Sequence, residues 1–514
     1  MDASRSRQWR RVLAMLLFLI PAAASLGVLG LRVATVVGPL GFLDTTTSGE
    51  SVQLLNVMKL QRGLPLYDHP VEPPFYPLAM HNIGFYKAYA WAVSTLGSDA
   101  EDLARGARLF TLALAAMGLG AALAYGLIDL RRRDPRLDSP WVAPTMVLAA
   151  LATWFGGLPG WWVVSIRPDI GGAAFAAVGL TLALAIGPRR EILAGLAAGA
   201  TLAVAWTFKQ SCILTWGGLM LSALVMRRWR FAAAVAAPLV ATVAGVNLLL
   251  GPDYRYNTMF AVSLAGFDFH NITNLSIHLA IKGILPLTIA ALALAGLRGA
   301  SWLRADEKAA LACCAGTTLM GGLAACYRNG SAMNYFFEFN AVAGLLAVVL
   351  GRRLVEVVAE RGHVWALAAV AAAGLGATAQ DVVRVVAPSR FDLVHDRFDV
   401  GRRAELDRAR GLLQKADGPV YCQPALSGLT LGLPFPVYNF DDEPFFHRPA
   451  AQRGLLKGDG VAGQVLSRYF RVIVAEPEND YLLSLARQAG YVEREDWKYF
   501  HVLTSPDVST ALAR

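Results

Sequence analysis

The chain has 514 residues, of which 55% are hydrophobic and only 17% are charged. Soluble domains have roughly 45–50% apolar and about 25% charged residues, so this composition favours a membrane protein over a soluble one. The net charge of +9 comes from short Arg and Lys clusters between apolar runs, unlike the basic, aromatic-interleaved face of a nucleic-acid-binding protein. The five cysteines show neither metal-ligand spacing nor a dense disulfide framework.

Eleven apolar stretches qualify as membrane spans, because about 20 residues are needed to cross a bilayer core of roughly 30 Å. They cover residues 12–37, 107–128, 141–155, 171–187, 192–208, 212–226, 231–250, 277–297, 309–326, 333–350 and 364–387. The third is short, so we expect it to be tilted or partly re-entrant. The first begins like a secretory signal, but its long apolar core favours a retained helix.

The clusters of Arg and Lys give the orientation, because they mark cytoplasmic loops. With eleven spans, every cluster falls on the side of the amino terminus: residues 5–11, 131–133, 189–190, 227–230, 298–308 and 352–353. We therefore expect a cytoplasmic amino terminus and an outer carboxy-terminal tail.

The first outer loop, about 38–106, contains two amphipathic stretches at 49–62 and 82–97. Both are too short to span, and we expect two interfacial helices on the outer leaflet.

The composition changes at about residue 388, where charged residues increase and β-like runs alternate with helical patterns at 400–416 and around 480–489. The predicted fold is therefore an all-α polytopic membrane domain over residues 1–387 and a small extracytoplasmic α/β domain over 388–514.

Polar residues gather at the outer ends of the spans and in the outer loops, and such groups at membrane depth indicate function. They are Asp44, Glu50, Arg105, Arg108, Arg167, Asp169, Lys209, Gln210, Arg328, Asn334, Tyr335 and Glu338. This one-sided distribution predicts a site on the outer face.

Glu50 and Asp44 are the candidate catalytic residues, because sugar transfer needs a carboxylate that accepts the proton of the acceptor hydroxyl. Glu50 opens the first interfacial helix, where a carboxylate also interacts well with the helix dipole. Asp44 precedes three threonines and also suits a loop or cap. Both interpretations stay open for each residue.

Lys209 and Arg167 are candidates to stabilise a departing phosphate. For Lys209, which lies between two tightly joined spans, snorkelling to the headgroups is the alternative. For Arg167, an ion pair with Asp169 is the alternative, and Arg105 is equally suited to anchor the second span.

The remaining candidates are substrate-binding residues: Asp169, Gln210, Asn334, Tyr335, Glu338 and His81. Asn334 and Glu338 share a helix face because they are four residues apart. Polar helix–helix packing is the alternative for Glu338, and ordinary packing is the alternative for His81.

The order of these motifs resembles bacterial GT-C glycosyltransferases of the protein-mannosyltransferase and aminoarabinose-transferase type (family 39-like), over roughly residues 10–385. The resemblance is carried by an acidic first loop, a helix ending Gly63-Leu64-Pro65-Leu66-Tyr67, then Pro73-Pro74, Tyr76-Pro77, Ala104-Arg105, Arg108-Leu109, Arg167-Pro168-Asp169, Lys209-Gln210 and Asn334-Tyr335 with Glu338.

This resemblance implies an enzyme of the cell envelope, in the bacterial inner membrane, that transfers a sugar from a polyprenyl phosphate to an extracytoplasmic glycan, lipid or protein. Such enzymes generally invert the anomeric carbon with a first-loop acid as base. Many relatives carry Asp-Glu there, whereas this chain has Gly49-Glu50, so Glu50 is preferred by position and Asp44 is its competitor. Lys209, Arg167 and Arg105 then hold the lipid phosphate. No cofactor is certain; the outer carboxylates allow a divalent cation, but no ligand spacing indicates one.

The main alternative is a transporter or lipid flippase, which needs polar groups near mid-membrane and favours related halves. A scaffold presenting the tail domain is a second alternative, and it leaves the polar first loop unexplained.

Overall fold

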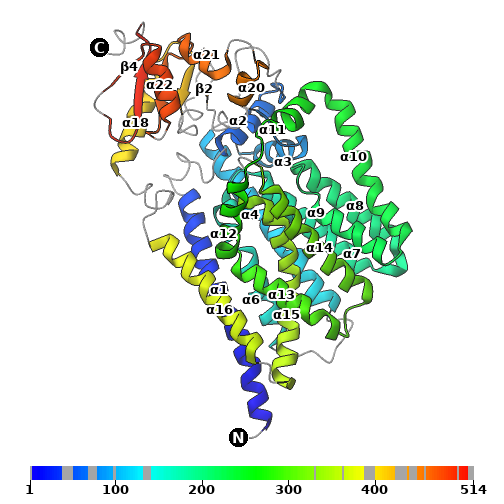
Figure 1. Ribbon diagram of the computed structural model, residues 1–514. Helices are drawn as coiled ribbons and strands as arrows, with labels where there is room; N and C mark the ends of the chain where they lie inside the picture. Colours follow the sequence, from blue (N-terminus) through cyan, green and yellow to red (C-terminus); the bar gives the residue numbers. More distant parts are fainter. Residues whose placement is uncertain are drawn as a thin grey trace.

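A computed structural model describes residues 3–37, 50–67, 78–96, 100–130, 141–328, 332–361, 364–386, 400–422, 437–438, 448–456, 459–477, 479–494 and 497–506. The chain forms a large helical part and a small α/β part at one end of it (Figure 1).

The helical part follows the apolar pattern of the sequence. In chain order its α-helices are α1 (Ala3–Val37), α2 (Glu50–Gln61), α3 (Ile83–Val93), α4 (Ala100–Ala124), α6 (Val142–Trp154), α7 (Pro168–Ile186), α8 (Glu191–Phe208), α9 (Leu214–Val225), α10 (Trp229–Arg255), α11 (Ala261–Ser263), α12 (Phe269–Lys282), α13 (Ile284–Gly296), α14 (Ala305–Ala325), α15 (Phe337–Arg361) and α16 (Val364–Val386). The short 3₁₀ and π segments are η1 (Tyr125–Leu130), η3 (Gly160–Val164), η4 (Pro188–Arg190), η5 (Tyr256–Phe260), η6 (Leu297–Gly299) and η7 (Met333–Phe336).

The chain is an integral membrane protein: within the described residues, seven helical runs are long and apolar enough to cross a bilayer, or eight if one bent pair counts as a span. Three shorter apolar helices, at 142–154, 214–225 and 368–380, fall below that length. All eleven predicted stretches are thus helical, and the count of eleven spans stays a prediction.

The predicted span over 277–297 is helical but bent. The chain bends there by 77° between α12 and α13. Pro286 is the physical reason, because its ring lacks the N–H that would bond to Lys282 and clashes with that carbonyl. The helix therefore ends at Lys282 and restarts after Gly283, with Pro286 in the first turn, where proline is tolerated.

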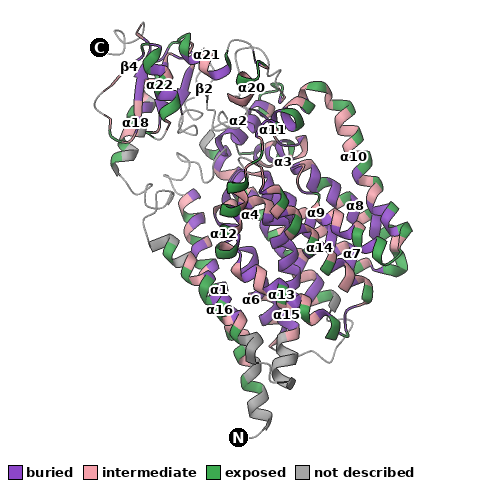
Figure 2. Cartoon of the chain, in the orientation of Figure 1, coloured by how far each residue is buried: buried purple, intermediate pink, exposed green. Residues whose placement is uncertain are grey.

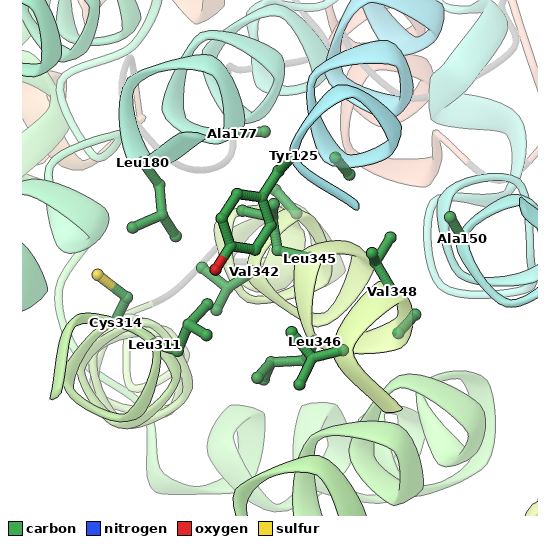
Figure 3. Packing of buried hydrophobic residues seen from close by; sticks show 14 of the residues in the cluster. Tyr125, Ala150, Ala177, Leu180, Leu311, Cys314, Val342, Leu345, Leu346 and Val348 are labelled. Atoms are coloured by element: carbon green, nitrogen blue, oxygen red, sulfur yellow. The ribbon is translucent and has the colours of Figure 1, made fainter. Parts of the chain in front are cut away.

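Helix α15 is the centre of the bundle. Of its most apolar window, 89% is buried, against 17% for the run that contains α10. Figure 3 shows its Val342, Leu345, Leu346 and Val348 among side chains of the surrounding helices. A helix that is apolar on all sides is expected to be surrounded by protein in this way, while α10 has an outward-facing apolar surface (Figure 2).

Small residues allow close packing around α15. A Cβ atom at Gly118 of α4 would lie 2.2 Å from the Trp154 ring, and one at Gly344 of α15 would lie 2.4 Å from it. Trp154 therefore fills space that two glycines leave between α4, α6 and α15, as expected where small residues allow helices to approach.

The carboxy-terminal part is the α/β structure predicted from the β-like runs. Its five-stranded sheet has the order β2-β1-β3-β5-β4. The strands β1 (Val420–Cys422), β2 (Val437–Tyr438) and β3 (Val472–Ala475) are parallel neighbours, and β4 (Val492–Glu493) and β5 (His501–Thr504) are antiparallel additions. The helices are α18 (Val400–Gln414), α20 (Arg448–Gln452), α21 (Gly460–Leu466) and α22 (Asp480–Gln488).

Both faces of the sheet are covered, since alternate residues of β3 belong to two apolar clusters. Leu264, just after α11, belongs to one of these clusters, so the α/β part packs on the end of the bundle that carries α2 and α11 (Figure 1). The division at 387/388 falls outside the described residues and stays a prediction.

Candidate active site

Asp169, in the first turn of α7, has three other predicted site residues around its carboxylate. The Lys209 ammonium, directly after α8, forms an ion pair with Asp169 Oδ1. Asn334 of η7 donates from Nδ2 to the same oxygen over 2.9 Å, and Arg167 Nε lies 3.6 Å from Oδ2. Three elements that are distant in sequence therefore converge on one buried carboxylate, because their ends lie at the same end of the bundle.

Aromatic rings hold both cations of this cluster. Lys209 Nζ lies 4.7 Å from the centroid of the Tyr335 ring, and the Arg167 guanidinium lies 4.8 Å from that of Trp162. Burial alone would lower the pKa of Lys209, but the adjacent Asp169 carboxylate outweighs it and the pKa is raised. Lys209 is therefore a fixed positive charge.

His81 lies next to the cluster. The segment that carries it is attached to the bundle by hydrogen bonds. Gln210 Nε2 donates to Met80 O over 3.2 Å, and Tyr67 OH donates to His81 O over 3.0 Å. Asn82 Nδ2 donates to Trp206 O of α8. Gln210 thus anchors this segment. Burial, followed by the nearby Arg167 and Lys209 charges, lowers the pKa of His81 well below its usual value, so the imidazole is neutral.

Glu50 is fully buried in an ion pair with Arg108 of α4. Arg108 Nη2 and Nε donate to the two carboxylate oxygens over 2.8 and 2.9 Å, and the Ile166 N–H donates to Oε1 over 2.9 Å. Glu50 joins α2 to α4 and to the segment before α7, and both oxygens are engaged. Its competitor as base, Asp44, lies outside the described residues.

Arg108 is a residue whose importance the sequence reasoning missed. The sequence placed it only among the polar residues of the outer face, whereas its side chain is fully buried. The available signal was a cation within the predicted span 107–128, where a charged side chain usually has a partner. Arg105 Nη1 lies 3.7 Å from Asp102 Oδ1 on the partly exposed side of α4, and its predicted role in phosphate binding stays a prediction.

Glu338 also lies outside the Asp169 cluster. Its carboxylate accepts hydrogen bonds from the N–H groups of Leu214 and Thr215, at 3.2 and 2.7 Å. These are the first residues of α9, whose N–H groups have no partner within the helix. The structure therefore gives Glu338 a capping contact between α15 and α9.

Several buried polar atoms of the cluster have no hydrogen-bond partner: Asp169 Oδ2, Asn334 Oδ1 and His81 Nε2. Leaving such a group unsatisfied costs about 1–3 kcal/mol, so it is typical of a site that a ligand completes. Among the described residues, no group of three or more His, Cys, Asp or Glu side chains is arranged to hold a metal ion.

The fold and this cluster define the class: a polytopic membrane protein with a buried charged site at helix ends and a small carboxy-terminal α/β part. No protein-family model and no curated relative matches the sequence. Among solved structures, the chain is similar to ArnT from Cupriavidus metallidurans bound to undecaprenyl phosphate, at 15% identity and a TM-score of 0.57, covering 93% of this chain and 97% of that one.

It is also similar to the apo form of the Archaeoglobus fulgidus oligosaccharyltransferase, at 11% identity and a TM-score of 0.53, covering 96% of this chain and 74% of that one. At these identities the likeness is one of fold. The chain therefore shares the fold of ArnT and of the archaeal oligosaccharyltransferase, as the resemblance in the sequence led us to expect.

Proposed function

We propose that the protein is a glycosyltransferase that moves a sugar from a polyprenyl phosphate to an extracytoplasmic glycan, lipid or protein. The observation that carries this proposal is the buried Arg167–Asp169–Lys209 cluster, at helix ends of a fold shared with a protein that binds undecaprenyl phosphate. Two cations against one carboxylate leave a net positive charge, which suits a lipid-linked phosphate.

In the proposed reaction, the acceptor oxygen forms a bond to the anomeric carbon while the bond from that carbon to the phosphate oxygen breaks. The phosphate leaves with the electron pair, and Lys209 and Arg167 stabilise its charge. Asp169 holds both cations in position. Attack opposite the leaving group inverts the anomeric carbon.

A first-loop carboxylate is proposed to accept the acceptor's proton. Because Arg108 and the Ile166 N–H occupy the oxygens of Glu50, we assign this role to Asp44 and a positioning role to Glu50. The ion pair then fixes the start of α2, six residues after Asp44.

We propose a bacterial inner-membrane protein with a cytoplasmic amino terminus. Helix α8 supports this orientation, because exposed Arg189 and Arg190 precede it and Lys209 follows it. Its 18 residues span about 27 Å. The basic loop before α8 and Lys209 of the candidate site after it would therefore lie on opposite sides of the hydrocarbon layer.

The test is sugar release from polyprenyl-phosphate sugars by the purified full chain in lipid, with native membrane acceptors. Lys209→Met is expected to lower turnover about 10- to 100-fold, since a hydrogen bond to a charged group contributes about 1.5–3 kcal/mol. Asp44→Asn is expected to abolish turnover while donor binding survives. The matched control is Lys87→Met, an exposed lysine on α3.

If a broad donor panel gives no turnover with the wild-type chain, and the Lys209 and Asp44 variants still complement a deletion strain, the glycosyltransferase proposal fails. Transport of the lipid would then be the better interpretation.

A further inference from the structure

A second set of polar side chains is buried beside the charged cluster, and its members are neutral. Gln53 and Asn56 of α2 are fully buried, and His81 is nearly so. Gln53 Nε2, both amide atoms of Asn56 and His81 Nε2 have no hydrogen-bond partner. Four such atoms in one region are unusual, because buried polar groups are nearly always paired.

Tyr86 of α3 connects these residues. Its hydroxyl donates to Gln53 Oε1 over 2.8 Å, which fixes the amide orientation and leaves the Nε2 donors unused. Its ring stacks with the His81 ring at a centroid distance of 6.5 Å and an angle of 29°. Asn56 lies three residues after Gln53, so the two amides are neighbours on the surface of α2.

This neutral group adjoins the proposed phosphate site. Besides burial, the charges of Arg167 and Lys209 lower the pKa of His81, and Gln210, which follows Lys209, donates to the carbonyl of Met80, the residue before His81. A ligand whose phosphate lies at Lys209 and Arg167 therefore has its next chemical group near His81 and Gln53. In a polyprenyl-phosphate sugar, that group is the sugar ring.

The charges around the neutral group are already paired. Glu50, one turn before Gln53, is neutralised by Arg108, and Asp169 by Lys209 and Arg167. An ammonium group on the sugar would find no unpaired carboxylate among these residues, and burying it unpaired would be costly. Hydroxyl groups, which both donate and accept, match amides and a neutral imidazole.

We infer that Gln53, Asn56 and His81 form a subsite for the donor's sugar, and that this sugar is an uncharged hexose or pentose rather than an amino sugar. The inference rests on the proposed function.

The experiment compares binding of sugar-free undecaprenyl phosphate with binding of the same lipid carrying a neutral hexose, a neutral pentose or a 4-amino-4-deoxypentose. The full chain in lipid is used. Wild type is expected to bind one neutral-sugar lipid at least about tenfold more tightly than both the amino-sugar lipid and the sugar-free lipid.

Gln53→Leu and Asn56→Leu are expected to remove most of that tenfold gain while binding of the sugar-free lipid stays unchanged. Gln61→Leu, an exposed amide at the end of α2, is the matched control. His81→Gln, which keeps a polar group, should retain more of the gain than His81→Leu.

The outcomes separate the two proposals. If wild type and Lys209→Met both fail to bind any of the lipids, the proposed function fails and the subsite with it. If the lipid phosphate binds through Lys209 but the amino-sugar lipid is preferred, only the subsite is overturned. The same holds if the Gln53 and Asn56 variants do not change the sugar-dependent gain.

Discussion

The Glu50–Arg108 ion pair is a structural contact, and its removal should be visible as lost stability. Glu50→Gln leaves the Arg108 guanidinium buried without its counter-charge, and breaking a buried pair in this way costs about 3–5 kcal/mol. We therefore expect a clearly lower unfolding temperature of the purified protein in detergent. The double variant Glu50→Leu/Arg108→Leu, which removes both charges, should recover part of the loss. A Glu50→Gln protein with wild-type stability and no turnover would instead identify Glu50 as the base.

His81 should make the folded protein sensitive to acid. Its pKa is lowered by burial and by the Arg167 and Lys209 charges, so the unfolded chain takes up a proton near pH 6.5 while the folded chain does not. Stability is thus expected to fall as the pH decreases below about 6.5 and to level off below the folded pKa.

The measurement is the unfolding temperature between pH 8 and pH 5 for wild type and His81→Gln. The variant lacks the titrating group and should lose less stability over that interval. Equal pH dependence of the two proteins would contradict a buried, neutral His81.

The candidate site was partly predictable from residue type and sidedness. Arg167, Asp169, Lys209 and Asn334 were singled out because they stand at outer ends of spans, and helix ends on one side of a bundle must converge. The partner of Glu50 was not predictable, since it depends on how α2 packs on α4. For the same reason, the sequence did not reveal that Glu338 points to the start of α9.

At the scale of elements, the Glu338 carboxylate is expected to hold the amino-terminal turn of α9. Glu338→Ala removes the acceptor of two N–H groups and should cost about 0.5–2 kcal/mol, as the loss of a helix cap does. Hydrogen exchange of the peptide that covers 214–225 should increase, while exchange in α7 stays unchanged. Glu338→Gln keeps an acceptor oxygen and serves as the control. Unchanged protection of α9 in the Ala variant would contradict the capping role.

The helices themselves were predictable because crossing a bilayer requires long apolar runs. Which helices lie at the centre of the bundle was not predictable, as α15 and α10 illustrate. Both are apolar in sequence, yet α15 is central and α10 peripheral. Hydropathy measures transfer out of water and is nearly the same for lipid-facing and protein-facing positions. The bend between α12 and α13 was not predicted, although Lys282, Gly283 and Pro286 interrupt the apolar stretch there.

At the scale of the whole molecule, function as proposed requires that the candidate site and the α/β part face away from the cytoplasm. Figure 1 shows the α/β part at the end of the bundle opposite the amino terminus, and Lys209 of the candidate site lies at the other end of α8 from Arg190. Ser94, just after α3, and Arg190, just before α8, are both exposed and mark the two ends. Single cysteines at these positions should therefore react differently with a membrane-impermeant maleimide added to spheroplasts.

Ser94→Cys is expected to be labelled in intact spheroplasts and Arg190→Cys only after permeabilisation. The wild-type chain gives the background, because four of its five cysteines are buried and Cys313 is half-buried. Basic loops resist transfer across the membrane, so the distribution of Arg and Lys predicts which of the two cysteines is labelled from outside. Labelling of Arg190→Cys from outside would reverse the topology. The cluster around Asp169 would then face the cytoplasm, and an extracytoplasmic acceptor would no longer be compatible with the site.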